Sequence, residues 1–153
     1  MTGLKEGDKA PDFKGVIENG SEVSLANYLG KKLVLYFYPK DSTPGCTAQA
    51  CNLTENQELL KNNGFEILGV SADSVKKHQN FISKYELGFS LIADENKEVI
   101  KAYQVWGPKK FMGKEYDGIH RTTFVINEQG NIERVFTKVK TKEHANQILE
   151  SYK

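Results

Sequence analysis

The chain has 153 residues, a length typical of one globular domain, and we expect a single domain over residues 1–153. Hydrophobic residues make up 39% of the sequence and charged residues 27%, a balance that argues against a disordered chain. The formal net charge of +1 gives no general attraction to nucleic acid or to anionic lipid, and every apolar run is too short to cross a bilayer. We therefore expect neither a nucleic-acid nor a membrane partner.

Two elements are predicted in the first forty residues. Short strand patterns at Asp12 to Ile17 and Glu22 to Ser24 flank the turn dipeptide Asn19-Gly20, which predicts a small added hairpin. The segment from Leu33 to Tyr38 is rich in aromatic and branched residues and ends at Pro39. Such a run is typical of a strand that is buried on both faces.

A helix and a second strand follow. The helical pattern starts at Pro44 and continues to a stop at Asn62-Asn63-Gly64. Its apolar stripe consists of Cys46, Ala50, Leu53 and Leu60. The segment from Phe65 to Val70 then repeats the pattern of a buried strand.

The next helix is predicted after Asp73-Ser74 and is expected to end at Gly88. Its inward side chains are expected to be Val75, Phe81, Ile82 and Tyr85. A short strand follows at Phe89 to Ile92, and Asp94 is placed to cap another helix. The apolar residues of that helix are Val99, Ile100 and Tyr103.

The last third of the chain predicts a hairpin and a helix. Strand patterns at Thr122 to Ile126 and Ile132 to Phe136 flank a turn that contains Gly130. The terminal helix has the stripe Ala145, Ile148, Leu149 and Tyr152. The order of elements predicts an α/β protein of thioredoxin-like fold, with a central mixed β-sheet flanked by helices and an N-terminal β-hairpin extension.

The two cysteines of the chain, Cys46 and Cys51, lie in the helix predicted from Pro44. Thr43 is suited to the N-cap and Pro44 to the first helical position, so Cys46 lies near the unpaired amides of the helix start. Those amides favour negative charge, and a helix N-terminus favours the thiolate form of a cysteine. In open α/β sheets the active site lies beyond the carboxyl ends of the parallel strands, which is where Cys46 is expected.

A metal site or a structural disulfide fits this cysteine pair less well than a reactive role. A zinc site uses four ligands at short spacings, whereas His78, His120 and His144 are scattered singly, so we expect no metal. A structural disulfide implies an oxidising compartment, but the polar N-terminal segment is not a signal peptide. We therefore expect a cytoplasmic protein in which the cysteines have a redox or nucleophilic role.

The residues around Cys46 resemble a known family. Pro39, Thr43 and Cys46 match the Pro-x-x-x-Thr/Ser-x-x-Cys active-site motif of peroxiredoxins. Cys51 stands where the bacterioferritin comigratory protein branch, also called peroxiredoxin Q, keeps its resolving cysteine. The resemblance covers nearly the whole chain and includes the segment that ends at Arg121.

The resemblance implies a thiol-dependent peroxidase of antioxidant defence that reduces hydrogen peroxide and organic hydroperoxides. Cys46 is then the peroxidatic cysteine, Pro39 and Thr43 shape its pocket, and Arg121 is its cationic partner. The Cys46 thiolate becomes a sulfenic acid, Cys51 converts this acid to a disulfide, and thioredoxin or a similar dithiol reduces the disulfide. This chemistry needs no cofactor, and we expect a monomer because both thiols lie on one chain.

Alternatives remain for single residues. Arg121 at a strand end could only extend its charge to solvent, and Thr43 could be only an N-cap. Trp106 and Phe111 are expected to pack around the site, and the cluster formed by Lys109, Lys110 and Lys114 is expected to be a solvated loop. His120 has no assigned role, and the fold of the segment from Val105 to Ile119 is not predicted.

Two other functions use similar chemistry. A thiol-disulfide oxidoreductase on the same fold usually carries Cys-x-x-Cys, which this chain lacks. A peroxide sensor would form the same sulfenic acid and pass its disulfide to a partner protein. A disulfide between Cys46 and Cys51 requires the helix to change. A regular helix holds their Cα atoms about 8.7 Å apart, beyond disulfide range, so the helix start is expected to unwind.

Overall fold

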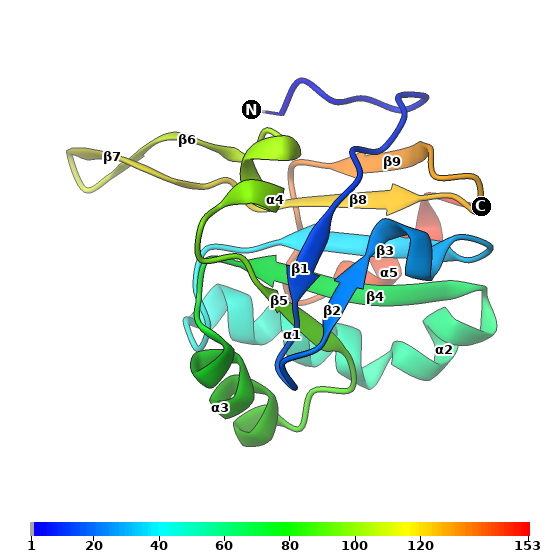
Figure 1. The fold of residues 1–153 in the computed structure, drawn as a ribbon, viewed down its shortest axis with the longest axis horizontal. Helices are drawn as coiled ribbons and strands as arrows, with labels where there is room; N and C mark the ends of the chain where they lie inside the picture. The colour runs from blue at the N-terminus through cyan, green and yellow to red at the C-terminus, as the bar shows by residue number, and fades with distance from the viewer. Residues whose placement is uncertain (1) are drawn as a thin grey trace.

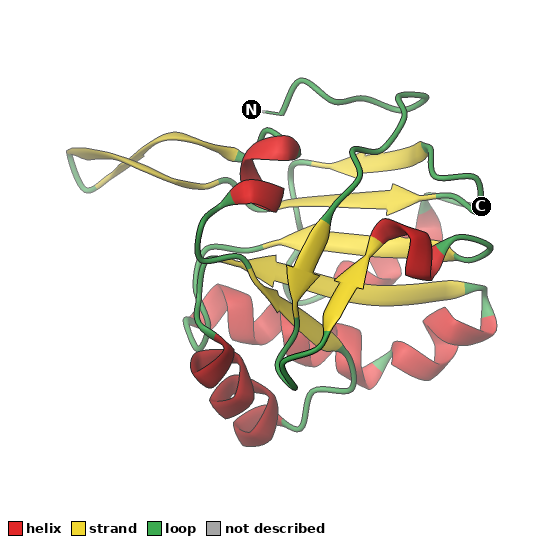
Figure 2. Ribbon diagram, in the orientation of Figure 1, coloured by secondary structure: helices red, strands yellow, loops and turns green. Residues whose placement is uncertain are grey.

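A five-stranded mixed sheet forms the centre of the computed structural model, which describes residues 2–153 (Figures 1 and 2). Its strands are β3 (Lys32–Phe37), β4 (Phe65–Ser71), β5 (Ser90–Ala93), β8 (Thr122–Ile126) and β9 (Ile132–Phe136). The order is β5-β4-β3-β8-β9, in which β3, β4 and β5 are parallel and β8 runs antiparallel to both of its neighbours. The predicted mixed sheet is confirmed.

Helices cover both faces of the sheet (Figure 2). They are η1 (Leu25–Tyr28), α1 (Pro44–Glu55), α2 (Gln57–Asn62), α3 (Val75–Tyr85), α4 (Glu98–Ala102) and α5 (His144–Glu150). Along β3, Val34 and Tyr36 join the cluster packed by α1, α2, α3 and α5, whereas Leu35 and Phe37 join the one packed by η1 and α4. This alternation follows from the two-residue period of a strand. Within residues 2–153, no helix combines the length and the apolar composition needed to cross a membrane.

The N-terminal hairpin is present as predicted. Strands β1 (Lys14–Val16) and β2 (Glu22–Ser24) pair antiparallel. In their turn the Asn19 side chain accepts a hydrogen bond from the Ser21 amide (2.8 Å), and Gly20 has a φ of 84°. Gly15 lies so close to Ile92 that a Cβ atom would come within 2.5 Å of it, which shows how tightly the hairpin packs beside β5.

Several helix boundaries differ from the prediction. The helix predicted from Pro44 to Asn62 is divided at Asn56 (φ −106°, ψ 11°), whose side chain donates a hydrogen bond to the Asn52 carbonyl. Such a local side-chain bond competes with helix continuation. Helix α3 ends at Tyr85, before Gly88, because Glu86 adopts the left-handed conformation (φ 51°).

Asp94 caps α4 from outside the formal N-cap position. Lys97 occupies that position, while the Asp94 carboxylate accepts hydrogen bonds from the amides of Val99 (3.3 Å) and Ile100 (2.8 Å). Two of the amides left free at the start of a helix thereby gain hydrogen-bond partners. Asp94 therefore caps the helix as expected, but from a position three residues before the N-cap.

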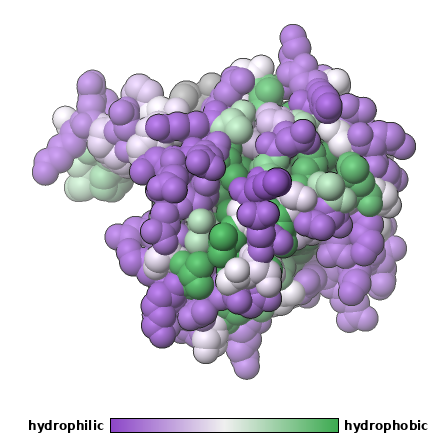
Figure 3. All heavy atoms as spheres, in the orientation of Figure 1, coloured by the Kyte–Doolittle hydropathy of each residue, from purple (hydrophilic) through white to green (hydrophobic). Residues whose placement is uncertain are grey.

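The segment from Val105 to Ile119, whose fold was not predicted, forms a hairpin that projects from the body of the protein (Figure 1). Strands β6 (Trp106–Phe111) and β7 (Lys114–Ile119) join at Met112-Gly113, where both residues have positive φ, as type I′ hairpin turns require. Phe111 is 66% exposed, so the expectation that it packs around the site is wrong. Figure 3 shows apolar residues on this hairpin among hydrophilic ones, and a larger apolar area over the middle of the same face.

Candidate active site

Cys46 lies in the first turn of α1, directly beyond the carboxyl end of β3. Thr43 holds the N-cap position in extended conformation and Pro44 begins the helix, as predicted. The Cys46 side chain is 1% exposed and belongs to the cluster under α1. Half-buried Pro39 follows β3 and opens the loop that leads to the helix.

The Thr43 hydroxyl does not cap the helix. It donates a hydrogen bond to the Lys40 carbonyl (2.8 Å) and makes no bond to a helix amide. The prediction of a side-chain cap is therefore wrong, because the hydroxyl closes the tight loop before the helix. A hydroxyl that donates in this way keeps its lone pairs free to accept another hydrogen bond.

Arg121 lies beside the sulfur although it is 75 residues away in sequence. It precedes β8, which pairs with β3, so the sheet brings it to the start of α1. Its Nη2 donates to Cys46 Sγ (3.3 Å) and its Nη1 to Gln49 Oε1 (2.7 Å). The side chain therefore contacts the thiol, and the fixed fork of the guanidinium sets the direction of its donors.

Gln49 is a member of the site that was not predicted from the sequence. It lies one helical turn after Cys46 and is fully buried, and its Oε1 accepts the second bond of Arg121. The sequence could have indicated Gln49, because it lies three residues after Cys46 and residues three apart on a helix share a face. A polar side chain on the same face as an apolar stripe needs a partner inside the protein.

Gly45 leaves room for this arrangement. A Cβ atom at this position would lie 3.1 Å from Arg121 Nη2, which cannot withdraw without lengthening its bonds to Cys46 and Gln49. We therefore expect Gly45→Ala to slow the oxidation of Cys46 by peroxide about tenfold, since small displacements at a reacting centre are costly. Stopped-flow oxidation measures this effect, with thermal unfolding as the control. An unchanged rate in a folded variant would contradict it.

Cys51 lies in the second half of α1 and is partly exposed. Both cysteines are free thiols on one intact helix. Burial, and then the nearby carboxylate of Glu55, raise the pKa of the Cys51 thiol above its ordinary value. In this conformation Cys51 is therefore held in its protonated, less nucleophilic form.

Three further residues lie on or directly after the hairpin of β6 and β7. Lys109, expected in a solvated loop, instead turns back so that its Nζ donates to the Ile119 carbonyl (2.9 Å). Burial, and then the charge of Arg121, lower the pKa of Lys109. Trp106 is partly buried against the core cluster that contains Leu35 and Phe37, not the one that contains Cys46. His120 donates from Nε2 to the Pro108 carbonyl (3.0 Å).

His144 forms a buried polar contact behind the site. Its Nδ1 bonds Gln147 Oε1 (2.9 Å) and its Nε2 bonds the Thr123 hydroxyl (2.8 Å). Because Gln147 Oε1 is an acceptor, the proton lies on Nδ1 and the Thr123 hydroxyl donates to Nε2. Burial, together with the charge of Arg121, lowers the pKa of His144 to about 4, and its Gln147 bond opposes this only in part.

The depressed pKa of His144 predicts a loss of stability in acid. Between pH 6.5 and about 4 the unfolded chain binds a proton at this residue that the folded chain does not. The contribution of neutral His144 to the free energy of unfolding is therefore fully present above pH 6.5. It is lost as the pH falls towards 4, and the loss amounts to up to about 3 kcal/mol. Urea unfolding at pH 7 and pH 4.5 measures the difference, which should shrink in His144→Gln. An equal fall in both proteins would contradict the assignment.

Comparisons with known proteins extend beyond this geometry. The model of the AhpC/TSA family matches residues 6–135. Peroxiredoxin Bcp of Escherichia coli is 46% identical over 97% of this chain and 96% of its own, and the Bacillus subtilis protein of the same name is 44% identical over 98% and 96%. These relatives match the chain along nearly its full length.

Solved structures agree. A Xanthomonas campestris bacterioferritin comigratory protein, studied for its alkyl peroxide reduction activity, has a TM-score of 0.88 and 34% identity, with 96% of each chain covered. A Cys-to-Ser variant of Xylella fastidiosa PrxQ has a TM-score of 0.92 and 29% identity, with 99% of this chain and 97% of its own covered. The thioredoxin-like fold is confirmed. The chain belongs to the AhpC/TSA family and, within it, to the Bcp/PrxQ peroxiredoxins, which are thiol peroxidases.

Proposed function

We propose that this chain, as one domain, reduces hydrogen peroxide and organic hydroperoxides through a sulfenic acid at Cys46 and a disulfide between Cys46 and Cys51. The observation that carries the proposal is the contact of Arg121 Nη2 with Cys46 Sγ (3.3 Å). It places a permanent positive charge and a directed donor beside a cysteine at a helix N-terminus. Alkyl peroxide reduction by the Xanthomonas campestris relative supports organic hydroperoxides as substrates.

In the first step the Cys46 thiolate attacks one peroxide oxygen and the O–O bond breaks. The attacked oxygen stays on sulfur as sulfenic acid, and the other leaves as water or alcohol after taking up a proton. Arg121 stabilises the negative charge that develops on the leaving oxygen. The Thr43 hydroxyl, whose proton is directed to the Lys40 carbonyl, offers an acceptor to the peroxide O–H. Pro39 forms part of the wall that limits access of water.

In the second step the Cys51 sulfur attacks the sulfenic acid and water leaves. Both cysteines lie on α1, where a regular helix separates their Cα atoms by about 8.7 Å, whereas disulfides span about 4.4–6.8 Å. The first turns of α1 must therefore open. Asn52 marks the end of the opening segment, because its side chain bonds the Lys142 carbonyl and the Ala145 amide.

We expect the disulfide form to lose amide protection in residues 44–51 and to keep it beyond Asn52. The reason is that the segment before Asn52 has to unwind, while the bonds of Asn52 to the start of α5 hold the rest of the helix. Hydrogen exchange of the reduced and oxidised proteins measures this difference, with α3 as the internal control. Equal protection of residues 44–51 in both states would contradict the opening.

In the third step a dithiol protein, of which thioredoxin is the proposed example, reduces the disulfide. A cytoplasmic location and an antioxidant role agree with this supply of reductant, and a monomer suffices because both reacting thiols are on one chain. No cofactor enters any step.

Turnover separates an enzyme from a sensor. With thioredoxin, its reductase and NADPH, the protein should consume many equivalents of hydrogen peroxide and of an organic hydroperoxide. Consumption that stops at about one equivalent per chain, with thioredoxin still reduced, would identify a sensor instead. The same assay with both peroxides gives the substrate preference.

A further inference from the structure

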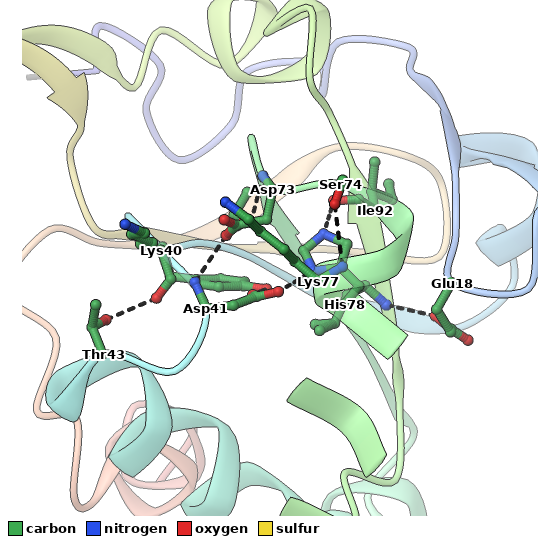
Figure 4. Close-up of polar contacts among 12 residues, drawn as sticks. Glu18, Lys40, Asp41, Thr43, Asp73, Ser74, Lys77, His78 and Ile92 are labelled. Atoms are coloured by element: carbon green, nitrogen blue, oxygen red, sulfur yellow. Dashed lines mark hydrogen bonds and ion pairs between the residues drawn. The ribbon is translucent and has the colours of Figure 1, made fainter. Parts of the chain in front are cut away.

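The loop between β3 and α1 is held by a buried charged network that lies outside the catalytic contacts described above. Figure 4 shows Asp41 of this loop beside His78 of α3. His78 Nδ1 contacts Asp41 Oδ2 (2.7 Å) and its Nε2 contacts the Ile92 carbonyl (2.9 Å). The Tyr38 hydroxyl donates to Asp41 Oδ1 (2.6 Å). The carboxylate thus joins the end of β3 to α3, and the His78 ring connects α3 to β5.

The hydrogen-bond partners determine the protons of this pair. The carbonyl of Ile92 only accepts, and a carboxylate only accepts, so a ring that satisfies both contacts donates from both nitrogens. With Asp41 ionised, His78 is the positive partner of a buried ion pair. The two side chains are 0% and 5% exposed, and burial of this kind demands full pairing.

A second anchor holds the backbone of the same residue. The Asp41 amide donates to Asp73 Oδ2 (2.8 Å), and the same oxygen accepts from the Ser71 hydroxyl (2.7 Å). Ser71 is the last residue of β4. Asp41 is therefore fixed through its side chain and its main chain at once, by elements that all lie outside α1.

The loop needs this support. Ser42 adopts a left-handed backbone conformation (φ 63°), which is unfavourable for a residue other than glycine and persists only where the surroundings impose it. Asp41 lies two residues after Pro39 and two before Thr43, so its position sets that of both.

We propose that Asp41 and His78 are positioning residues for peroxide reduction, holding the loop so that Pro39 and Thr43 face the peroxide that Cys46 attacks. The inference rests on the proposed function. Because the anchors are on α3, on β5 and in the loop between β4 and α3, the loop before α1 keeps its place when α1 opens. Once the disulfide is reduced, Cys46 therefore returns to a preformed pocket.

Asp41→Asn and Asp41→Ala form a matched pair for the test. In Asp41→Asn the amide oxygen accepts from Tyr38, and the amide nitrogen donates to Nδ1 of a neutral His78 that still donates from Nε2 to Ile92. Every side-chain contact is kept and both charges are lost. Asp41→Ala removes the contacts altogether.

The readout is the ratio of two rate constants of Cys46, one for oxidation by hydrogen peroxide and one for alkylation by iodoacetamide at the same pH. Thiolate content and general access affect both rates, whereas peroxide orientation affects only the first. We expect this ratio to fall about 30-fold in Asp41→Ala and to stay within about threefold of wild type in Asp41→Asn. Ser74→Ala, which removes the hydrogen bond from the Lys77 amide at the start of α3, is the control for a weakened helix and should leave the ratio unchanged.

An unchanged ratio in folded Asp41→Ala overturns the inference, and so does an equal fall in Asp41→Asn and Asp41→Ala. If Asp41→Ala does not fold, Tyr38→Phe decides, because it removes one bond to Asp41 and keeps the ring that stacks on Tyr36. The ratio should then fall about threefold, and no fall overturns the inference. Failure of wild-type Cys46 to react with peroxide would instead refute the proposed function.

Discussion

Replacing Cys46 by serine is expected to abolish peroxide consumption, lowering it by several orders of magnitude to the background rate. A serine hydroxyl is not appreciably ionised near neutral pH and is a poor nucleophile towards oxygen. The contact with Arg121 cannot compensate, since it stabilises a charge that the hydroxyl does not develop. Stopped-flow and steady-state consumption of hydrogen peroxide measure the loss.

Cys51→Ser is the matched control, because it makes the same substitution five residues along the same helix. This variant should react with peroxide once, at nearly the wild-type rate, and then stop. Its sulfenic acid persists or climbs to sulfinic acid in excess peroxide, because no neighbouring thiol traps it. An intact Cys46 after peroxide treatment of this variant would overturn the assignment of the two roles.

Arg121→Lys is expected to slow Cys46 oxidation about a hundredfold, the usual effect of losing one donor to a developing oxyanion. The substitution keeps the positive charge but loses the fork that bonds Cys46 and Gln49 at once. A lysine ammonium therefore leaves the peroxide poorly oriented.

Stopped-flow oxidation, compared with alkylation of Cys46 by iodoacetamide, separates orientation from ionisation in this variant. Lys109→Met shows what a positive charge near the site contributes without the fork, because Lys109 lies near Arg121 but donates to the Ile119 carbonyl. We expect it to have a much smaller effect. Equal rates in wild type and Arg121→Lys would leave Arg121 as a structural residue, which is the alternative that its sequence position allows.

The sequence was sufficient wherever hydrophobic pattern and helix signals agree. The strand before Pro39, the helix start at Pro44 and the mixed sheet were predicted because burial on two faces and a proline at the first helical position leave clear patterns. The neighbourhood of Cys46 was predicted for the same reason, since the end of a parallel strand places it.

The rest depends on contacts between distant segments. The bond of Arg121 to Gln49 and the return of Lys109 to Ile119 join residues through the sheet, and local spacing contains no trace of them. Thr43 holds the N-cap position that the sequence indicates, but its hydroxyl is turned to the Lys40 carbonyl in the loop and makes no bond to a helix amide. The contact of His78 with Asp41 was not predicted because a single histidine on a helix has no local partner, and Asp41 lies 37 residues away.

The most direct test of the proposed chemistry is the state of both cysteines after wild-type protein reacts with one equivalent of hydrogen peroxide. Intact mass spectrometry with peptide mapping should show the loss of two hydrogen atoms per chain and an intramolecular disulfide between Cys46 and Cys51. In Cys51→Ser the same treatment should add one oxygen atom, at Cys46. A disulfide between two chains, or an oxidised Cys51 beside an unmodified Cys46, would contradict the proposed chemistry.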